Sequence, residues 1–155
     1  MEIAKALNDH PLLLTLHIRL AMLALDQELV DKASDDLDKA WDAQQSLPDH
    51  ERITWRVSHL YNLMGWVWLK KGDHHQAIIH IQKAIELGEI AKVAQSVSEA
   101  QWWLAEAFLS AGLLDNAQEN LDKVSRTFAR LGKNIYAERH VQLQERIRAA
   151  QGRTH

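Results

Sequence analysis

Small residues recur along this chain at a fixed spacing, and apolar residues surround them in a fixed register. A pair of small residues 12 positions apart occurs three times: Ala21 with Ala33, Gly65 with Ala77, and Ala105 with Ala117. The same apolar frame surrounds the first and third pairs, at Leu20, Ala24, Leu37 and Ala40 and at Leu104, Phe108, Leu121 and Val124. Small side chains are required where two helices joined by a short turn approach closely. The pattern therefore predicts three helical hairpins.

The spacing of helix-breaking residues leaves little room for elements other than helices. Only two prolines and six glycines interrupt the chain, and both prolines suit helix starts, where a missing N–H costs nothing. Asp73 and Gln76 have the spacing of a capping box, which predicts the start of a helix there. Gly112 and Gly132 suit helix ends. The predicted helices span residues 2–8, 11–26, 30–46, 50–71, 74–90, 95–111, 114–131 and 134–150.

The middle hairpin carries the fullest set of marked positions: Tyr61, Met64, Gly65, Trp68, Ala77, Ile81 and Ala84. This set resembles the tetratricopeptide repeat, a helix-turn-helix unit whose arrays form right-handed solenoids used in protein interaction. The resemblance covers about residues 14–131. The usual Pro after the second helix is missing, since Gln45, Glu89 and Ala129 stand there, and equivalent positions lie 44 and 40 residues apart, where about 34 is usual. Such extended repeats resemble those of MalT-type bacterial regulators.

The resemblance implies an all-α, right-handed solenoid of antiparallel helical hairpins in a single domain of 155 residues. We expect repeats at about 11–46, 50–90 and 95–131. A capping helix at 134–150 would close the solenoid with one polar outer face. Its apolar stripe is Tyr136, Leu143 and Ile147, and its polar face is Glu138, Arg139, Glu145, Arg146 and Arg148. Residues 2–5 recur as residues 89–92 (EIAK), which suggests that the chain is part of a longer array.

Composition narrows the classes of protein that the chain can represent. The absence of cysteine excludes disulfides and thiol chemistry. The first ten residues lack the basic start and apolar run of a signal peptide. The most apolar stretch, 12–25, is interrupted by His17 and Arg19 and is shorter than the roughly 18 apolar residues of a membrane-spanning helix. We therefore expect a cytoplasmic protein with no membrane partner.

Charge is distributed unevenly along the chain. Residues 1–50 contain four Lys or Arg and ten Asp or Glu, a net of −6, whereas residues 126–155 contain seven and two, a net of +5. Four aspartates fall on one helical face: Asp31, Asp35, Asp38 and Asp42. Two interpretations stay open. The face is either a solvated outer surface or a docking surface for a basic partner, including head-to-tail self-association through the basic C-terminal helix.

In tetratricopeptide arrays the first helix of each unit lines a concave groove. The resemblance carries groove positions over to Ile18 and Met22, and to a set we call the six predicted groove residues: His59, Asn62, Trp66, Glu99, Trp102 and Glu106. Tryptophan is a favoured interface anchor, and the two carboxylates suit an amphipathic helix that carries Lys or Arg. The competing interpretation places tryptophans in the core. We expect that for Trp68 and, between units, for Trp41, Trp55 and Trp103.

The sequence offers no pattern for catalysis, metal binding or a cofactor. No two of the nine histidines stand three or four apart on a helix, as a helical zinc motif requires. No Gly-rich phosphate loop and no paired nucleophile and base are present. The net charge of −3 disfavours nucleic acid, since backbone binding needs a basic patch.

The pattern therefore favours a non-enzymatic module that binds a protein or peptide. The preferred function is binding of a peptide or partner helix in the concave groove, in a bacterial regulatory or signalling protein. The alternative is a ligand-sensing segment of a regulator, in which a small molecule binds between repeats. A third interpretation is a spacer in a longer array, with no ligand of its own.

Overall fold

The computed structural model describes residues 9–131 and 137–153. All regular elements within these residues are helices: α2 His10–Asp26, α3 Val30–Gln45, the 3₁₀ turn η1 Asp49–Glu51, α4 Thr54–Lys70, α5 His74–Ile90, α6 Ala94–Ser110, α7 Leu114–Leu131 and α8 Ala137–Arg153. The all-α prediction is confirmed. The helix predicted at 2–8 and the predictions for Gly132 and Tyr136 lie outside the described residues.

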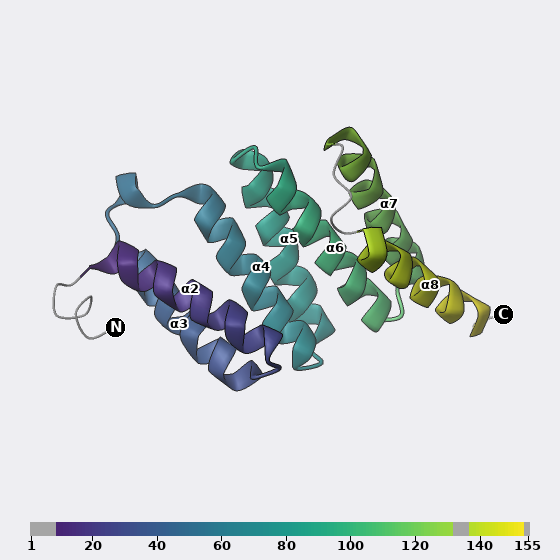
Figure 1. Ribbon diagram of the computed structural model, residues 1–155, viewed down its shortest axis with the longest axis horizontal. Coiled ribbons are helices and arrows are strands. Elements are labelled where there is room, and N and C mark those ends of the chain that lie inside the picture. Colours follow the sequence, from purple (N-terminus) through teal and green to yellow (C-terminus); the bar gives the residue numbers. More distant parts are fainter. Residues whose placement is uncertain (1–8, 132–136, 154–155) are drawn as a thin grey trace.

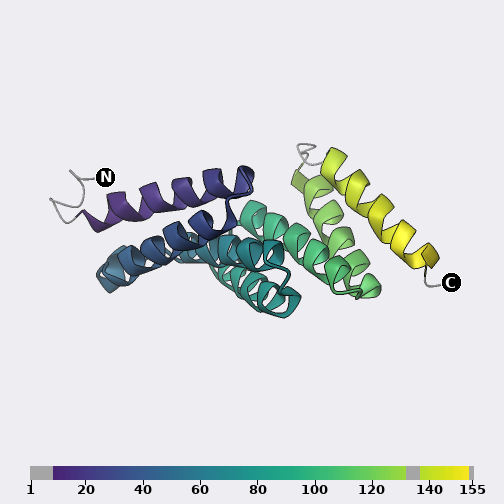
Figure 2. The same cartoon turned by 90° about the horizontal axis from the view of Figure 1, so that it is seen from below.

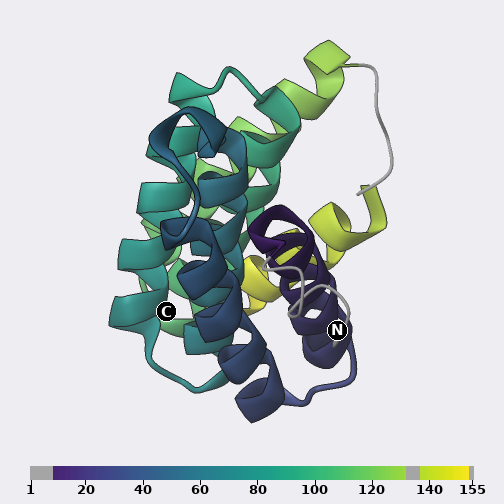
Figure 3. The same cartoon turned by 90° about the vertical axis from the view of Figure 1, so that its left-hand side faces the viewer.

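Consecutive helices pair into three hairpins that stack side by side: α2 with α3, α4 with α5, and α6 with α7 (Figure 1). The first helices of the hairpins form an inner row, since α2 contacts α4 and α4 contacts α6. Helix α8 continues this row by contacting α6 and α7. Figure 3 shows α2 and α8 on the same side of the stack. The arrangement is that of a helical solenoid similar to tetratricopeptide arrays.

Four interhelical turns share one backbone feature. In each, the second residue after the helix end has a positive φ: Glu28 (59°), Gly72 (84°), Lys92 (58°) and Gly112 (78°). Glycine adopts this conformation at little cost, whereas the Cβ atoms of Glu28 and Lys92 make it unfavourable. The prediction that Gly112 lies at a helix end is confirmed. The sequence did not indicate that a Glu and a Lys occupy the same position in the other turns.

Local side-chain contacts define the helix starts. The Asp73 carboxylate accepts a hydrogen bond from the backbone N–H of Gln76 at 3.0 Å, which confirms the predicted cap of α5. Asp9 caps α2 in the same way through the N–H of Leu12, at 3.0 Å. Pro11 stands in the first turn of α2, where its missing N–H has no helical partner to lose.

Helix α4 begins at Thr54 rather than at the predicted residue 50. The intervening residues form η1 and an extended segment at Arg52 and Ile53. The Arg52 side chain donates hydrogen bonds to the carbonyl oxygens of Leu47 and Gln45, at 2.9 and 2.8 Å. The segment therefore satisfies acceptors at the end of α3 before the next helix starts.

The small residues that predicted the hairpins lie at the contacts between paired helices. All five alanines of the three pairs have an exposed fraction of 0%, and Gly65 is buried. A Cβ atom at Gly65 would overlap the side chain of Ile81 and would lie 3.3 Å from the carbonyl oxygen of Ala77. The predicted close approach of paired helices is therefore confirmed.

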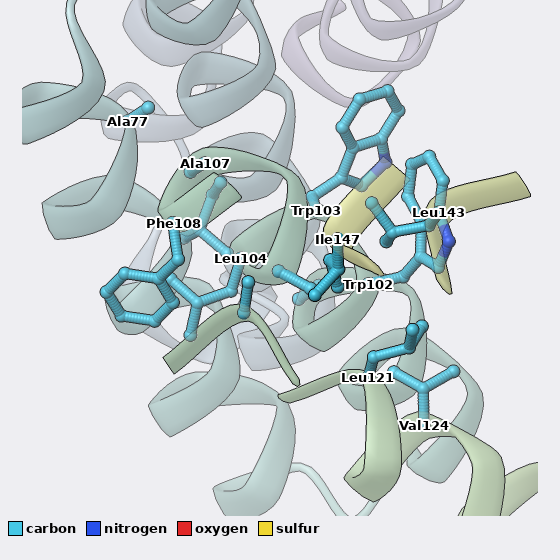
Figure 4. Close-up of a cluster of buried hydrophobic side chains, with 14 of the residues drawn as sticks. Ala77, Trp102, Trp103, Leu104, Ala107, Phe108, Leu121, Val124, Leu143 and Ile147 are labelled. Carbon is cyan, nitrogen blue, oxygen red and sulfur yellow. The ribbon is translucent and has the colours of Figure 1, made fainter. Parts of the chain in front are cut away.

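Two buried apolar clusters lie along the solenoid and meet at α4. The N-terminal cluster combines residues of α2 and α3 with Leu60, Leu63 and Val67 of α4. The C-terminal cluster combines residues of α5, α6, α7 and α8 (Figure 4). Trp66 packs against both clusters. Helix α4 therefore joins the two halves of the core.

Candidate functional site

The six predicted groove residues come from two neighbouring helices of the inner row. Within each helix they stand three or four residues apart and so share one helical face. Helix α4 carries the first three and α6 the last three: His59, Asn62, Trp66, Glu99, Trp102 and Glu106. Helices α4 and α6 contact each other. The fold thus places the two triplets on adjacent elements.

The three residues of α4 are covered to different degrees. Asn62 is buried, and its Oδ1 atom has no hydrogen-bond partner among the described residues. His59 is half-buried, and desolvation lowers its pKa from the usual 6.5, because burial disfavours the charged imidazolium. Trp66 is half-buried and stacks on Trp103 of α6, with ring centroids 4.3 Å apart and planes inclined by 31°. This ring contact couples α4 to α6.

An arginine of α8 covers a pair of tryptophans on α6. Trp102 and Trp103 are buried and meet edge to face, with ring centroids 4.7 Å apart. The guanidinium carbon of Arg139 lies 4.1 Å from the Trp102 centroid and 5.6 Å from that of Trp103, within range of a cation–π attraction. Burial raises the pKa of Glu99 above its usual 4.5, and the positive charge of Arg139 acts in the opposite direction. Arg139 therefore interacts with aromatic faces and with a carboxylate.

A second arginine of α8 binds Glu106. Arg146 donates two hydrogen bonds, from Nη1 to Oε1 at 2.6 Å and from Nη2 to Oε2 at 2.8 Å. Glu106 is only 8% exposed, whereas the Arg146 side chain is 53% exposed. Paired charge-assisted hydrogen bonds fix orientation as well as position. Removal of the arginine would leave a buried carboxylate without its charged partner.

Apolar and amide contacts complete the docking of α8. Leu143 and Ile147 are fully buried in the cluster that contains Trp102 (Figure 4). Gln118 of α7 and Gln144 of α8 exchange two side-chain hydrogen bonds, at 2.8 and 2.6 Å. Figure 2 shows α8 alongside α7 at the end of the stack. Helix α8 is therefore held by both helices of the third hairpin.

The positions of Arg139 and Arg146 correct the prediction that both belong to the polar outer face of a capping helix. They share the side of α8 that carries Leu143 and Ile147, because residue 143 follows 139 by four and precedes 146 by three. This spacing was the available signal. Arginine is ordinarily assigned to the polar face of a helix because of its charge. Its long apolar stem can nevertheless cover an apolar surface while the charged end keeps polar contacts. The predicted apolar stripe is confirmed for Leu143 and Ile147.

The tryptophans outside the six predicted groove residues mostly pack as expected. Trp41 packs against the N-terminal cluster, Trp68 packs against the C-terminal cluster, and Trp103 is buried. The prediction for Trp55 was wrong, since this side chain is 45% exposed. Trp55 lies in the first turn of α4, directly after the extended segment, and the Arg56 guanidinium carbon lies 5.6 Å from its ring centroid.

The acidic face of α3 is exposed at all four predicted positions: Asp31, Asp35, Asp38 and Asp42. Asp35 pairs with Lys39 at 3.0 Å on the same helix. Self-association through this face and the basic α8 stays a prediction. Within residues 9–131 and 137–153, no three His, Asp or Glu side chains gather as a metal site would require. No helix in the same ranges is long and apolar enough to cross a membrane.

Comparison with known families bears on the central hairpin. The profile of a family described as "Tetratricopeptide repeat" matches residues 58–87. Residues 58–87 are therefore similar to a tetratricopeptide repeat. The match runs from α4 into α5 and includes the three predicted groove residues of α4. No curated protein matches the chain.

The similarity of residues 58–87 to this family bears on function only at the level of the family. Tetratricopeptide repeats generally mediate protein–protein interaction, and proteins of this family are typically non-enzymatic scaffolds. The resemblance to repeats of the MalT type stays a prediction, as does the role of the six predicted groove residues.

Proposed function

We propose that this chain is a protein–protein interaction module that binds a helix of a partner protein on the inner face of α4 and α6. The proposal is supported by the tetratricopeptide-type repeat of α4 and α5, since such repeats generally mediate protein interaction. Equivalent positions lie 44 and 40 residues apart, and this long spacing resembles the extended repeats of MalT-type bacterial regulators. We therefore assign the module to a bacterial regulatory or signalling protein.

The observation that carries the proposal is the seating of α8 on α6. A basic amphipathic helix meets this surface through a cation over Trp102, a forked ion pair to Glu106 and apolar side chains in the cluster. A helix of another protein can make each of these contacts. Helix-in-groove recognition uses anchors at positions such as i, i+4 and i+7, which is the spacing of Arg139, Leu143 and Arg146.

The proposal predicts that a partner helix depends on the inner-row carboxylates. A hydrogen bond to a charged group contributes about 1.5–3 kcal/mol, which corresponds to a tenfold or larger change in affinity. A full chain with Glu99→Gln and Glu106→Gln should therefore capture its partner from cell extract at least tenfold less efficiently than the wild type. Cross-links from the captured protein should map to α4 and α6 and should come from a helical, basic segment.

A matched control removes carboxylates from the outer row, which consists of the second helices of the hairpins, α3, α5 and α7. Glu86 of α5 and Glu119 of α7 are exposed and pair with lysines on their own helices. A chain with Glu86→Gln and Glu119→Gln should retain the partner. Melting temperatures establish that both variants are folded. Equal capture by the two double variants, or cross-links confined to the outer row, would reject the proposal.

A further inference from the structure

The contact face of α8 combines two kinds of arginine recognition with two apolar anchors. Arg139 lies over the Trp102 ring, and its positive charge opposes the rise in the pKa of Glu99. Arg146 forms a bidentate ion pair with Glu106 through two hydrogen bonds. Leu143 lies between the two arginines in sequence and Ile147 directly follows Arg146, and both side chains are buried in the C-terminal cluster. Together these four residues define a pattern, Arg-x-x-x-Leu-x-x-Arg-Ile, along one helical face.

The receiving surface distinguishes these arginines from others on the same helix. Arg148 and Arg153 of α8 are exposed, whereas Arg146 reaches a nearly buried carboxylate. A planar guanidinium fits both a carboxylate fork and an aromatic face, and an ammonium fits neither as well. Recognition on this surface therefore depends on the position and the type of the cation.

The docked state of α8 leaves buried polar atoms unpaired. The indole Nε1 atoms of Trp102 and Trp103 are buried and have no hydrogen-bond partner among the described residues. A buried donor without an acceptor lowers the stability of the state that buries it. A helix that makes the same contacts and also presents an acceptor to one of these indoles would bind the surface more favourably than α8 does.

We propose that α8 is the intramolecular occupant of the α6 part of this helix-binding surface, where it also contacts the adjoining side of α7, and that a partner helix with the pattern Arg-x-x-x-Leu-x-x-Arg-Ile replaces it. The inference rests on the proposed function for the existence of a partner helix. It adds the chemistry of that helix and a form of regulation. Because α8 is part of the chain, it competes at a high effective concentration, and the apparent affinity for a partner scales with the fraction of chains whose α8 is displaced.

The test uses a fluorescein-labelled peptide of residues 137–153 and full-length chains, with binding followed by fluorescence anisotropy. The Arg146→Glu chain should bind the peptide at least tenfold more tightly than the wild-type chain, because its own α8 is repelled by Glu106. Arg148→Glu is the matched control, since this exposed arginine lies on the same helix; its affinity should equal that of the wild type. Arg139→Ala is a second variant, which weakens α8 through loss of the contacts with the tryptophan rings and of the attraction to Glu99, and it should also tighten peptide binding.

A charge swap identifies the recognised ion pair. A chain with Glu106→Arg should lose the wild-type peptide and should bind a peptide carrying Arg146→Glu. A chain that carries both Glu106→Arg and Arg146→Glu restores the internal ion pair with reversed charges. It should bind either peptide only weakly. Circular dichroism and thermal melting establish that each chain is folded.

Any one of the following results would overturn the inference. Equal affinity of the Arg146→Glu and Arg148→Glu chains for the peptide would show that α8 is not a competitor. A concentration-dependent dimer of the wild-type chain that the peptide dissociates would assign the surface to α8 of a second copy instead. Capture of an extract partner that depends on Glu99 and Glu106 but is unaffected by excess peptide would retain the proposed function and reject this inference. Peptide binding without any captured partner would reject the proposed function and, with it, the partner helix of this inference.

Discussion

At Gly65 the backbone of α4 approaches α5 so closely that a Cβ atom would overlap the side chain of Ile81. The equivalent positions in the other hairpins are Ala21 and Ala105, which are fully buried. The middle hairpin therefore has the closest approach of the three at this position. The close approach depends on one residue and its facing partner, so it can be tested by single substitutions.

Gly65→Ala is expected to destabilise the protein by about 1–2 kcal/mol. Overpacking costs about 1–3 kcal/mol, and the overlap with Ile81 places this site in the upper part of that range, while the better helix propensity of alanine returns about 1 kcal/mol. The measurement is the free energy of unfolding from a denaturant titration. Gly152→Ala is the control, because nothing lies within 4 Å of its added Cβ; it should stabilise α8 by about 0.5–1 kcal/mol. A Gly65→Ala chain as stable as the wild type would contradict the close approach.

Glu99→Gln is expected to change the pH dependence of stability. Burial raises the pKa of Glu99 in the folded state above the usual 4.5, so the folded state binds more protons than the unfolded state over the interval between the two values. The wild type therefore loses stability as the pH rises above 4.5. Glutamine cannot ionise, so the variant should melt at a higher temperature than the wild type at pH 7. The difference should vanish below pH 4.5; a difference independent of pH would contradict the burial of this carboxylate.

Four turns between helices share one backbone conformation but have different residues at the position that adopts it. Gly72 and Gly112 adopt the left-handed backbone conformation, and so do Glu28 and Lys92. A left-handed residue with a Cβ atom costs about 1–2 kcal/mol. The chain tolerates this cost at two turns because the packing of the flanking helices determines where each turn lies.

Lys92→Gly is expected to stabilise the turn between α5 and α6 by up to about 1 kcal/mol. Relief of the left-handed strain is partly offset by the greater conformational entropy of glycine in the unfolded chain. Lys92 is exposed, so few other contacts change. Gly112→Lys, the reverse substitution in the next turn, should destabilise by a similar amount. Chemical denaturation of both variants gives the two values, and a loss of stability in Lys92→Gly would refute the strain argument.

At the scale of the whole molecule, α4 links two cores. Leu60, Leu63 and Val67 belong to the N-terminal cluster, while Trp66 packs against both clusters and stacks on Trp103. In a solenoid each unit contacts only its neighbours, so cooperativity depends on the interfaces between units. Trp66 therefore occupies the position that couples the N-terminal hairpin to the remainder.

Trp66→Ala is expected to separate the unfolding of α2 and α3 from that of the C-terminal half. Truncation of a buried tryptophan costs about 3–5 kcal/mol, and the half-buried Trp66 should cost somewhat less. Hydrogen exchange should show faster opening of α2 and α3, with smaller changes in α6 and α7. Trp55→Ala is the control, since that side chain is exposed; it should change stability by less than about 0.5 kcal/mol. A single cooperative transition that shifts uniformly would count against two linked cores.

The helices, the hairpins and the apolar faces could be predicted from the amino-acid sequence alone. These features depend on local physics: residues three or four apart share a helical face, small residues permit close approach, and Asp73 caps the helix that follows it. The repeat around Gly65 and Ala77 could be found for the same reason. The six predicted groove residues followed from the tetratricopeptide resemblance that this repeat carries, and their placement on two helices followed from the predicted helix boundaries.

The contacts that cover those faces could be identified only from the folded arrangement of the helices. The contact between Glu106 and Arg146 joins residues 40 positions apart, and no local pattern encodes such a pairing. A helical pattern shows that Leu143 and Ile147 are buried, but it does not show that the neighbouring arginines bind α6. The left-handed Lys92 and the exposed Trp55 were missed for a related reason, because both depend on how neighbouring helices pack and where each helix begins in space.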